Sequence, residues 1–187
     1  MTDHALAETR AWVDRAVIGL QLCPFAKAPQ VKGQVRYVAS EAVDADALLS
    51  DLVDELRLLA TAPVDGIETT LLVHPRVFTD FADHNDFLAI AEAALVALDL
   101  EGVIQIASFH PDYRFAGSEP GDIANATNRS PHPTLHLLRE DSIERALASF
   151  ADPDSIFEAN IATMERLGPE GWAALRRRCR DDAERAA

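Results

Sequence analysis

Three of the six histidines are followed directly by proline, at His74-Pro75, His110-Pro111 and His132-Pro133. The first two come where runs of apolar and β-branched residues end, at 69–73 and 103–109. Proline disfavours helix in the residue before it and cannot donate a hydrogen bond to a sheet, so each pair marks an abrupt strand exit. Ligands of open α/β sheets bind at the carboxyl ends of strands. The sequence therefore predicts a place for chemistry around His74 and His110.

Asp112 follows His110 by two positions, and an extended chain would turn both side chains to the same side. A carboxylate beside an imidazole fixes its tautomer and raises its basicity. We therefore predict that His110 is catalytic, as an acid/base or a ligand, and that Asp112 orients it. The alternative is that both side chains only anchor the following loop. His84 and His4 are expected in a helix-cap region and at the terminus, and His136 on a sheet surface or in the site.

Cys23 follows the first predicted helix, in the stretch Leu-Cys-Pro-Phe-Ala. We predict it as the third catalytic residue, as a nucleophile or a ligand. A helix C-terminus does not stabilise a thiolate, so Lys27 or a nearby imidazole has to supply positive charge. The alternative is a buried cysteine that packs as a small hydrophobic side chain. Cys179, in the last predicted helix, is expected to have no role.

Imidazoles also bind transition metals, and we predict His74 and His110 as ligands if the site holds an ion. No His-x-x-x-His pair lies in a predicted helix, where it would strengthen a zinc interpretation. Glycine-rich nucleotide motifs and a Gly-x-Ser-x-Gly elbow are also missing, so the sequence leaves the cofactor undetermined.

The polar stretch 125–133 carries Arg129, whose guanidinium suits a carboxylate or phosphate. We predict Arg129, Tyr113 and Asn128 as substrate-binding residues, with a small anionic molecule as the ligand. The alternative is a loop whose polar groups satisfy one another.

Hydrophobic periodicity predicts helices near residues 4–21, 43–60 and 80–98, and strands at 35–39, 68–73, 103–109 and 134–138. Strands joined by helices of this length form crossover units with parallel strands, which brings His74 and His110 to one edge. We predict an α/β fold with a mainly parallel or mixed four-stranded sheet, crossover helices and a helical C-terminal third.

We expect one domain over residues 1–187. The segment 111–133 holds four prolines and two glycines and is predicted to be a long loop over the site. C-terminal helices are predicted within 142–185, at 142–150, from Asp152-Pro153 through 154–167, and after Gly168-Pro169.

A formal charge of −14 argues against a nucleic acid or an anionic membrane as partner. No stretch approaches the roughly 18 apolar residues of a membrane span, and the N-terminus does not read as a signal peptide. Two cysteines do not make a disulfide framework, so a reducing cytoplasm is the expected location. The oligomeric state is not predicted.

Several stretches carry a family resemblance, and together they span roughly residues 9 to 168: LCPFA at 22–26, TLLVHP at 70–75, NDF at 85–87, QIASFHPDY at 105–113, TNRSP at 127–131 and LHLLRE at 135–140. In these stretches the chain resembles the domain-of-unknown-function family 1415. The resemblance implies a single domain and carries over no reaction, cofactor or catalytic residue.

The leading hypothesis is a small enzyme of hydrolytic or group-transfer type, with a Cys/His/Asp/Arg site under loop 111–133. One alternative is a non-catalytic module that binds a ligand or a partner. A further alternative is a redox protein that depends on a metal or on the Cys23 thiol.

Overall fold

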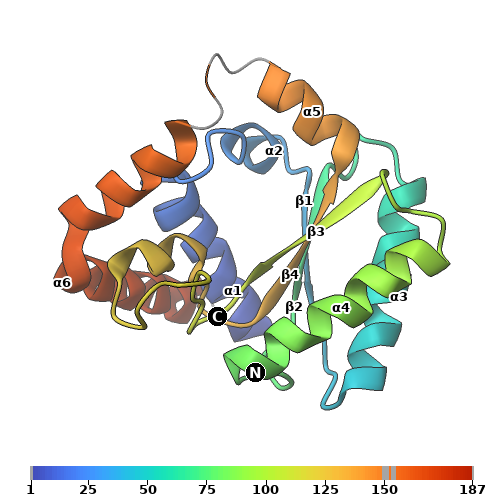
Figure 1. Cartoon of the computed structure of the whole chain (residues 1–187), viewed down its shortest axis with the longest axis horizontal. Coiled ribbons are helices and arrows are strands. Elements are labelled where there is room, and N and C mark those ends of the chain that lie inside the picture. Colours follow the sequence, from blue (N-terminus) through green and yellow to red (C-terminus); the bar gives the residue numbers. More distant parts are fainter. Residues whose placement is uncertain (1, 149–151, 153–154, 187) are drawn as a thin grey trace.

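A four-stranded mixed sheet with helices on both faces forms the centre of the computed structural model, which describes residues 2–148, 152 and 155–186 (Figure 1). The strands are β1 (Val35–Ala39), β2 (Thr69–Val73), β3 (Ile104–Phe109) and β4 (Thr134–Arg139). Their order is β1-β2-β4-β3. β1 pairs parallel with β2, while β4 runs antiparallel to both β2 and β3. The predicted α/β fold with a mixed four-stranded sheet is therefore confirmed.

The position of β4 is the feature that periodicity did not predict. β1, β2 and β3 run in the same direction, as crossover connections require, but β4 lies between β2 and β3. The backbone N–H of His74 donates to the carbonyl of Pro133 at 2.9 Å, which extends the pairing of β2 with β4 beyond the strand end. The carboxyl ends of β2 and β3 thus share one edge, separated by the start of β4.

The helices are α1 (Thr2–Trp12), the π-helix η1 (Val13–Ile18), α2 (Lys27–Val31), α3 (Ala45–Thr61), α4 (Phe81–Ala97), the 3₁₀-helix η2 (Ile123–Asn128), α5 (Glu140–Ala148) and α6 (Ser155–Ala186). Aspartate caps begin α3 and α4: Asp44 accepts from the N–H of Ala47, and Asp80 from those of Ala82 and Asp83. The short helix α2 lies between the predicted helix 4–21 and the predicted strand 35–39, where no helix was predicted.

Two apolar cores lie on opposite faces of the sheet. Leu72, Leu135 and Leu137 point toward α3 and α4, where Leu52 and Phe87 complete the packing. The other core is made by α1, η1, α6 and the opposite side of β1 and β2, and includes Trp12, Tyr37, Leu71, Met164 and Trp172. Figure 1 shows α3 and α4 on one side of the sheet and α1 and α6 on the other. Alternation along each strand decides which core a side chain enters.

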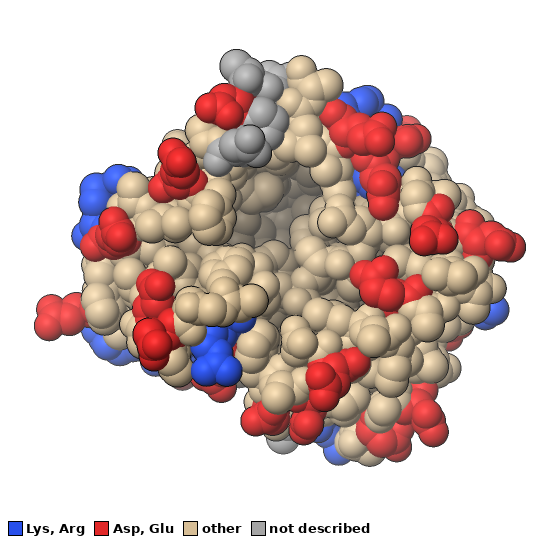
Figure 2. Space-filling model, viewed as in Figure 1, with Lys and Arg blue, Asp and Glu red and all other residues tan. Residues whose placement is uncertain are grey.

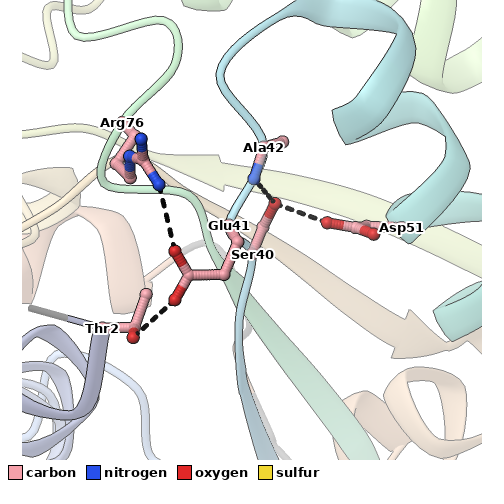
Figure 3. A network of polar contacts seen from close by, with 6 residues as sticks. All are labelled: Thr2, Ser40, Glu41, Ala42, Asp51 and Arg76. Atoms are coloured by element: carbon pink, nitrogen blue, oxygen red, sulfur yellow. Dashed lines mark hydrogen bonds and ion pairs between the residues drawn. The ribbon is translucent and has the colours of Figure 1, made fainter.

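A polar network joins the exits of β1 and β2 to the start of α1 (Figure 3). The hydroxyl of Ser40 donates to Asp51 of α3 at 2.5 Å. Glu41 accepts from the Thr2 hydroxyl at 2.7 Å and from Arg76 at 3.2 Å. These contacts hold the two chain segments that leave the sheet at the carboxyl edge.

The segment 111–133 is packed by its own polar groups. The Asn125 carbonyl oxygen accepts from the Phe115 N–H at 2.9 Å and from the Ser118 hydroxyl at 2.7 Å, while the Asn125 amide donates to the Glu119 carbonyl at 2.9 Å. One fully buried asparagine thus closes the middle of the segment, which also contains η2.

Helix α6 is interrupted at Gly168, where φ is 67° and ψ is 172°. This confirms the break that Gly168-Pro169 predicts, since glycine adopts a positive φ without steric cost. Helix α5 begins at Glu140, two residues before the predicted start. Residues 149 and 150 of the predicted helix 142–150, as well as Pro153 and residue 154 of the next, lie outside the described residues.

A substitution at Leu135 tests the packing of the core beneath α3 and α4, because this side chain of the central strand β4 is 0% exposed. We expect Leu135→Ala to lower the free energy of unfolding by about 2–5 kcal/mol, through lost apolar burial and the cavity left behind. The matched control is Val96→Ala on α4, where the side chain is 57% exposed and the change should stay within about 0.5 kcal/mol. Urea unfolding at neutral pH measures both; equal effects would contradict this core assignment.

Candidate functional site

Three imidazoles meet at the carboxyl edge of the sheet. His74 follows β2, His110 follows β3, and His84 comes from the first turn of α4. The ring centroids of His74 and His84 are 5.2 Å apart, as are those of His84 and His110, and all three residues are 0% exposed. His74 and His110 therefore do share one edge. His84 lies in the first turn of α4, in the helix-cap region where it was expected, and its ring lies between the other two.

The three rings differ in their hydrogen bonds. His110 accepts from the Asp112 backbone N–H through Nδ1 at 3.0 Å and donates through Nε2 to the Phe78 carbonyl at 3.3 Å. His74 donates through Nδ1 to the Val77 carbonyl at 3.0 Å, and its Nε2 is buried without a partner among the described residues. Both nitrogens of His84 are likewise buried without a partner in the described part of the chain. Asp112 thus orients His110 through its backbone, and both His110 nitrogens are engaged.

Burial keeps these rings neutral. It lowers the pKa of His74 to about 4 and that of His84 to about 3, and it also lowers the pKa of His110. The surroundings are aromatic: Phe81 contacts the ring of His110 with centroids 5.5 Å apart, and Phe78 lies 6.4 Å from the ring of His74. An apolar environment of this kind excludes an imidazolium at neutral pH.

The rings of the predicted metal ligands His74 and His110 each lie 5.2 Å from the ring of His84, measured between ring centroids. Over residues 2–148, 152 and 155–186, no group of three or more His, Cys, Asp or Glu side chains is arranged to hold a metal ion. Metal binding by His74 and His110 stays a prediction from the sequence.

Cys23 lies in the turn between η1 and α2 and is half-buried. Its backbone N–H donates to the Val17 carbonyl at 3.3 Å, and the neighbouring Leu22 carbonyl accepts from Asn160 of α6 at 2.9 Å. Burial raises the pKa of the Cys23 thiol, while the backbone N–H groups of Phe25 and Ala26 act in the opposite direction. In the described part of the chain, no hydrogen bond or ring contact joins Cys23 to His110.

The predicted substrate-binding residues lie around the start and end of loop 111–133. Arg129 donates to the Tyr113 carbonyl at 3.1 Å and to the Pro120 carbonyl at 2.9 Å. The Asn128 carbonyl accepts from the His110 N–H at 3.3 Å. The Tyr113 ring packs on Phe81, with centroids 5.3 Å apart. The structure brings these residues next to His110. The hydrogen bonds of the Arg129 guanidinium to two backbone carbonyls anchor the loop.

A hollow opens elsewhere, on the face of the sheet that carries α1 and α6. Figure 2 shows it near the middle of the view, where Figure 1 places the space between α2 and the sheet, below α5. The residues of β3 and β4 that point to this face are incompletely covered: Gln105 is exposed, and Ala107, His136 and Leu138 are half-buried. We call the space over this face of the sheet the β3–β4 hollow.

His136, one of the residues of this face, is held in one tautomer. The Thr69 hydroxyl donates to the Leu137 carbonyl at 2.6 Å, so its oxygen accepts from Nε2–H of His136 at 2.8 Å. Nδ1 then carries the lone pair, and among the described residues it has no hydrogen-bond partner and is not fully buried. Burial of the ring lowers its pKa to about 4, so it is neutral at pH 7.

A second groove, of about 310 Å³, runs beside β1 and α3 and is lined partly by Glu41, Asp51 and Glu55. All three of these carboxylates already have partners within the protein: Asp51 accepts from Ser40, Glu55 accepts two hydrogen bonds from Arg36, and Glu41 accepts from Thr2 and Arg76. None of the predicted site residues lines this groove.

The sequence carries a signal for the position of the His84 ring. His84 is spaced three residues from both Phe81 and Phe87, which places the ring on the same face of the helix as two aromatic side chains. Gln105 has a weaker signal, since it alternates with Ile104 and Ile106 and so faces away from their core. The sequence does not predict that the helices leave the Gln105 face of the sheet uncovered, because this depends on how the helices pack.

The family model described as protein of unknown function (DUF1415) matches residues 4–174 of the 187, and the chain belongs to this family. The resemblance drawn from the sequence is confirmed. No curated protein and no solved structure matches the chain. Of the helices that the structure describes, none has both the length and the apolar character needed to cross a bilayer.

The reactivity of Cys23 follows from its burial. In the Cys179→Ala variant, which leaves Cys23 as the one thiol, we expect alkylation by iodoacetamide to rise with pH along a curve centred above that of an exposed cysteine peptide, because burial disfavours the thiolate. Mass spectrometry across pH 6–11 measures the rates. A curve centred below that of the peptide would show an activated thiol and contradict this account.

Proposed function

We propose that this chain binds a small, uncharged polar molecule in the β3–β4 hollow, with His136 accepting a hydrogen bond from it. The observation that carries the proposal is Nδ1 of His136, which has no hydrogen-bond partner among the described residues while Thr69 holds the opposite nitrogen. A half-buried acceptor without a protein partner suits a ligand that brings its own donor.

The protonation state defines the kind of group that His136 would bind. Because burial lowers the pKa of His136 to about 4, the ring at neutral pH presents a lone pair and no charge. It would accept from a hydroxyl or an amide N–H of the ligand. Because the His136 ring is a weak base, it is better suited to bind the ligand through a hydrogen bond than to abstract a proton from it.

Gln105 supports a second polar contact. In the register of β3 with β4, Ala107 is opposite His136 and Gln105 is opposite Leu138. Gln105 is therefore the diagonal neighbour of His136 on the same face, at a spacing of about 7–8 Å between backbones. An exposed amide that both donates and accepts, next to the apolar side chains of Ala107 and Leu138, fits a compact ligand with polar groups on one side.

Charge favours a neutral ligand. The side chains visible inside the hollow in Figure 2 are neither acidic nor basic, and acidic residues lie on the surrounding surface. The chain as a whole carries a formal charge of −14. A small anion, as predicted from Arg129, would meet no basic side chain there, because the Arg129 guanidinium donates to loop carbonyls.

Hydrolytic or group-transfer catalysis is a second candidate function. The observation that favours it is Cys23, a half-buried thiol in the turn before α2, the helix beside the hollow in Figure 1. The N–H groups of Phe25 and Ala26 favour its thiolate against the effect of burial. A ligand in the hollow that slows alkylation of Cys23 would support this candidate.

A thermal-shift screen of uncharged metabolites tests the proposal. Compounds that raise the melting temperature of the wild type should bind His136→Phe roughly tenfold more weakly by calorimetry, because one hydrogen bond of about 1.4 kcal/mol is lost. Gln105→Leu should also weaken binding. The control is His132→Gln, since the ring of His132 bonds Glu8 instead. Ligands that bind wild type and His136→Phe equally would remove His136 from the site.

A further inference from the structure

We propose that the free edge of β1, together with the groove beside it, binds an extended basic segment of a partner protein, which adds to the sheet as a further strand. β1 is the first strand in the order β1-β2-β4-β3, and among the described strands it has a neighbour on one side only. Exposed sheet edges bind peptides in this way: main-chain hydrogen bonds give affinity, and pockets for alternate side chains give specificity. The proposal is independent of ligand binding in the β3–β4 hollow, because it concerns another strand and the side of the sheet that carries α3.

The pairing of β1 with β2 shows which backbone groups of β1 point to the free edge. Directly after the strand, the Ser40 N–H donates to the Val73 carbonyl of β2 at 2.8 Å. Peptide groups of a strand point to alternate sides, so the even-numbered residues bond β2. The N–H and C=O groups that point away from β2 are those of Val35, Tyr37 and Ala39. Within the described ranges no hydrogen bond from a loop or side chain reaches these groups, which leaves a template for another strand.

The groove of about 310 Å³ lies along this edge. Val38 and Ala39 both line it, although their side chains point to opposite faces of the sheet. A space that touches both residues lies beside the backbone of the strand. Its other wall is α3, which contributes Asp51, Asp54 and Glu55, and Figure 3 shows Asp51 next to the exit of β1. The strand thus offers an extended peptide a backbone to pair with, and the helix offers a wall for its side chains.

The charge of the groove defines the partner. The polar side chains that line it are all carboxylates: Glu41, Asp51, Asp54 and Glu55. Arg36 forms an ion pair with Glu55 at 2.7 Å, and Arg76 forms one with Glu41 at 3.2 Å. The charges of Asp51 and Asp54 are not balanced by an ion pair with any described residue, and Asp54 is exposed. Lysine or arginine at alternate positions of an added strand would meet these two carboxylates.

The same charges disfavour a second copy of this chain at the edge. Two β1 edges that pair about a twofold axis would bring the acidic grooves of both copies to one interface. Like charges that face each other across paired strands are destabilising, and each copy carries a formal charge of −14. A basic strand satisfies the same backbone groups and also balances the carboxylates. Charge complementarity therefore selects a basic segment as the occupant.

Fluorescence anisotropy with the labelled peptide Lys-Val-Lys-Val-Lys-Val-Lys and the full chain tests the proposal at low salt. We expect this peptide to bind at least about tenfold more tightly than its counterpart with glutamate in place of lysine. Two further peptides are methylated at the backbone nitrogens of either the lysines or the valines. One of these should bind about tenfold more weakly than the other, because only one set of N–H groups faces β1. Equal binding of the two methylated peptides, or no preference for lysine, would overturn the proposal.

Asp54→Lys is the informative variant, because it reverses a charge in the groove at an exposed position of α3. It should bind the lysine peptide about threefold to tenfold more weakly than the wild type. The matched control is Glu165→Lys, which makes the same change of net charge at an exposed position of α6, on the opposite side of the sheet, and should bind like the wild type. Equal losses in both variants would show that the peptide senses only the net charge, against the proposed site.

Nuclear magnetic resonance of the wild type locates the lysine peptide on the chain. We expect the backbone amide signals of Tyr37 and Ala39 to shift and to gain protection from hydrogen exchange, while those of β3, the other edge strand, stay unchanged. Shifts confined to β3 or to the β3–β4 hollow would overturn the proposal. A dimer in light scattering that the lysine peptide does not dissociate would assign the β1 edge to a second copy if these two amides are protected without peptide, and would also overturn it.

Discussion

The structure depends on the pairing of β4 with both β2 and β3. In this register, Leu135 and Leu137 point into the core beneath α3 and α4, and His136 between them points to the opposite face. A slip of one residue would exchange these faces, exposing two leucines and burying an imidazole among apolar side chains. Pro133, the residue before this strand, supplies the carbonyl that fixes the backbone of His74. The apolar core, the β3–β4 hollow and the imidazole cluster therefore all depend on the pairing of β4 with β2 and β3.

The histidines show how one residue type behaves in two environments of this sheet. His136 is neutral with one nitrogen bonded to Thr69 and the other open, which makes it a stable acceptor. His74 is neutral with one nitrogen, and His84 with both nitrogens, without a partner among the described residues, so their burial costs free energy that the surrounding aromatic packing must offset. The first arrangement suits recognition of a ligand. The second arrangement, at His74 and His84, is stable only while the rings carry no added proton.

Periodicity and strand exits predicted most of the fold. The strands at 35–39 and 69–73, the long helices α3 and α4 and the break at Gly168 agree with the structure, because each has a local cause in apolar spacing, caps or glycine. The meeting of His74 with His110 was predicted from the shared strand direction. The insertion of β4, the place of His84 between those rings and the open face at Gln105 depend on contacts between distant segments, for which a single sequence carries no periodic signal.

The inserted strand is also the reason why we propose a ligand site in the hollow and not at the carboxyl edge. In open α/β sheets a crevice forms outside the strand ends where the strand order reverses. Here the antiparallel β4 enters between β2 and β3 at that edge, and Phe78 and Phe81 pack there with the three imidazoles. The edge is filled by the protein itself. On the α1 and α6 side, by contrast, the helices cover β1 and β2 but leave Gln105 and His136 within reach of solvent, so a polar ligand has room and an unused hydrogen-bond acceptor.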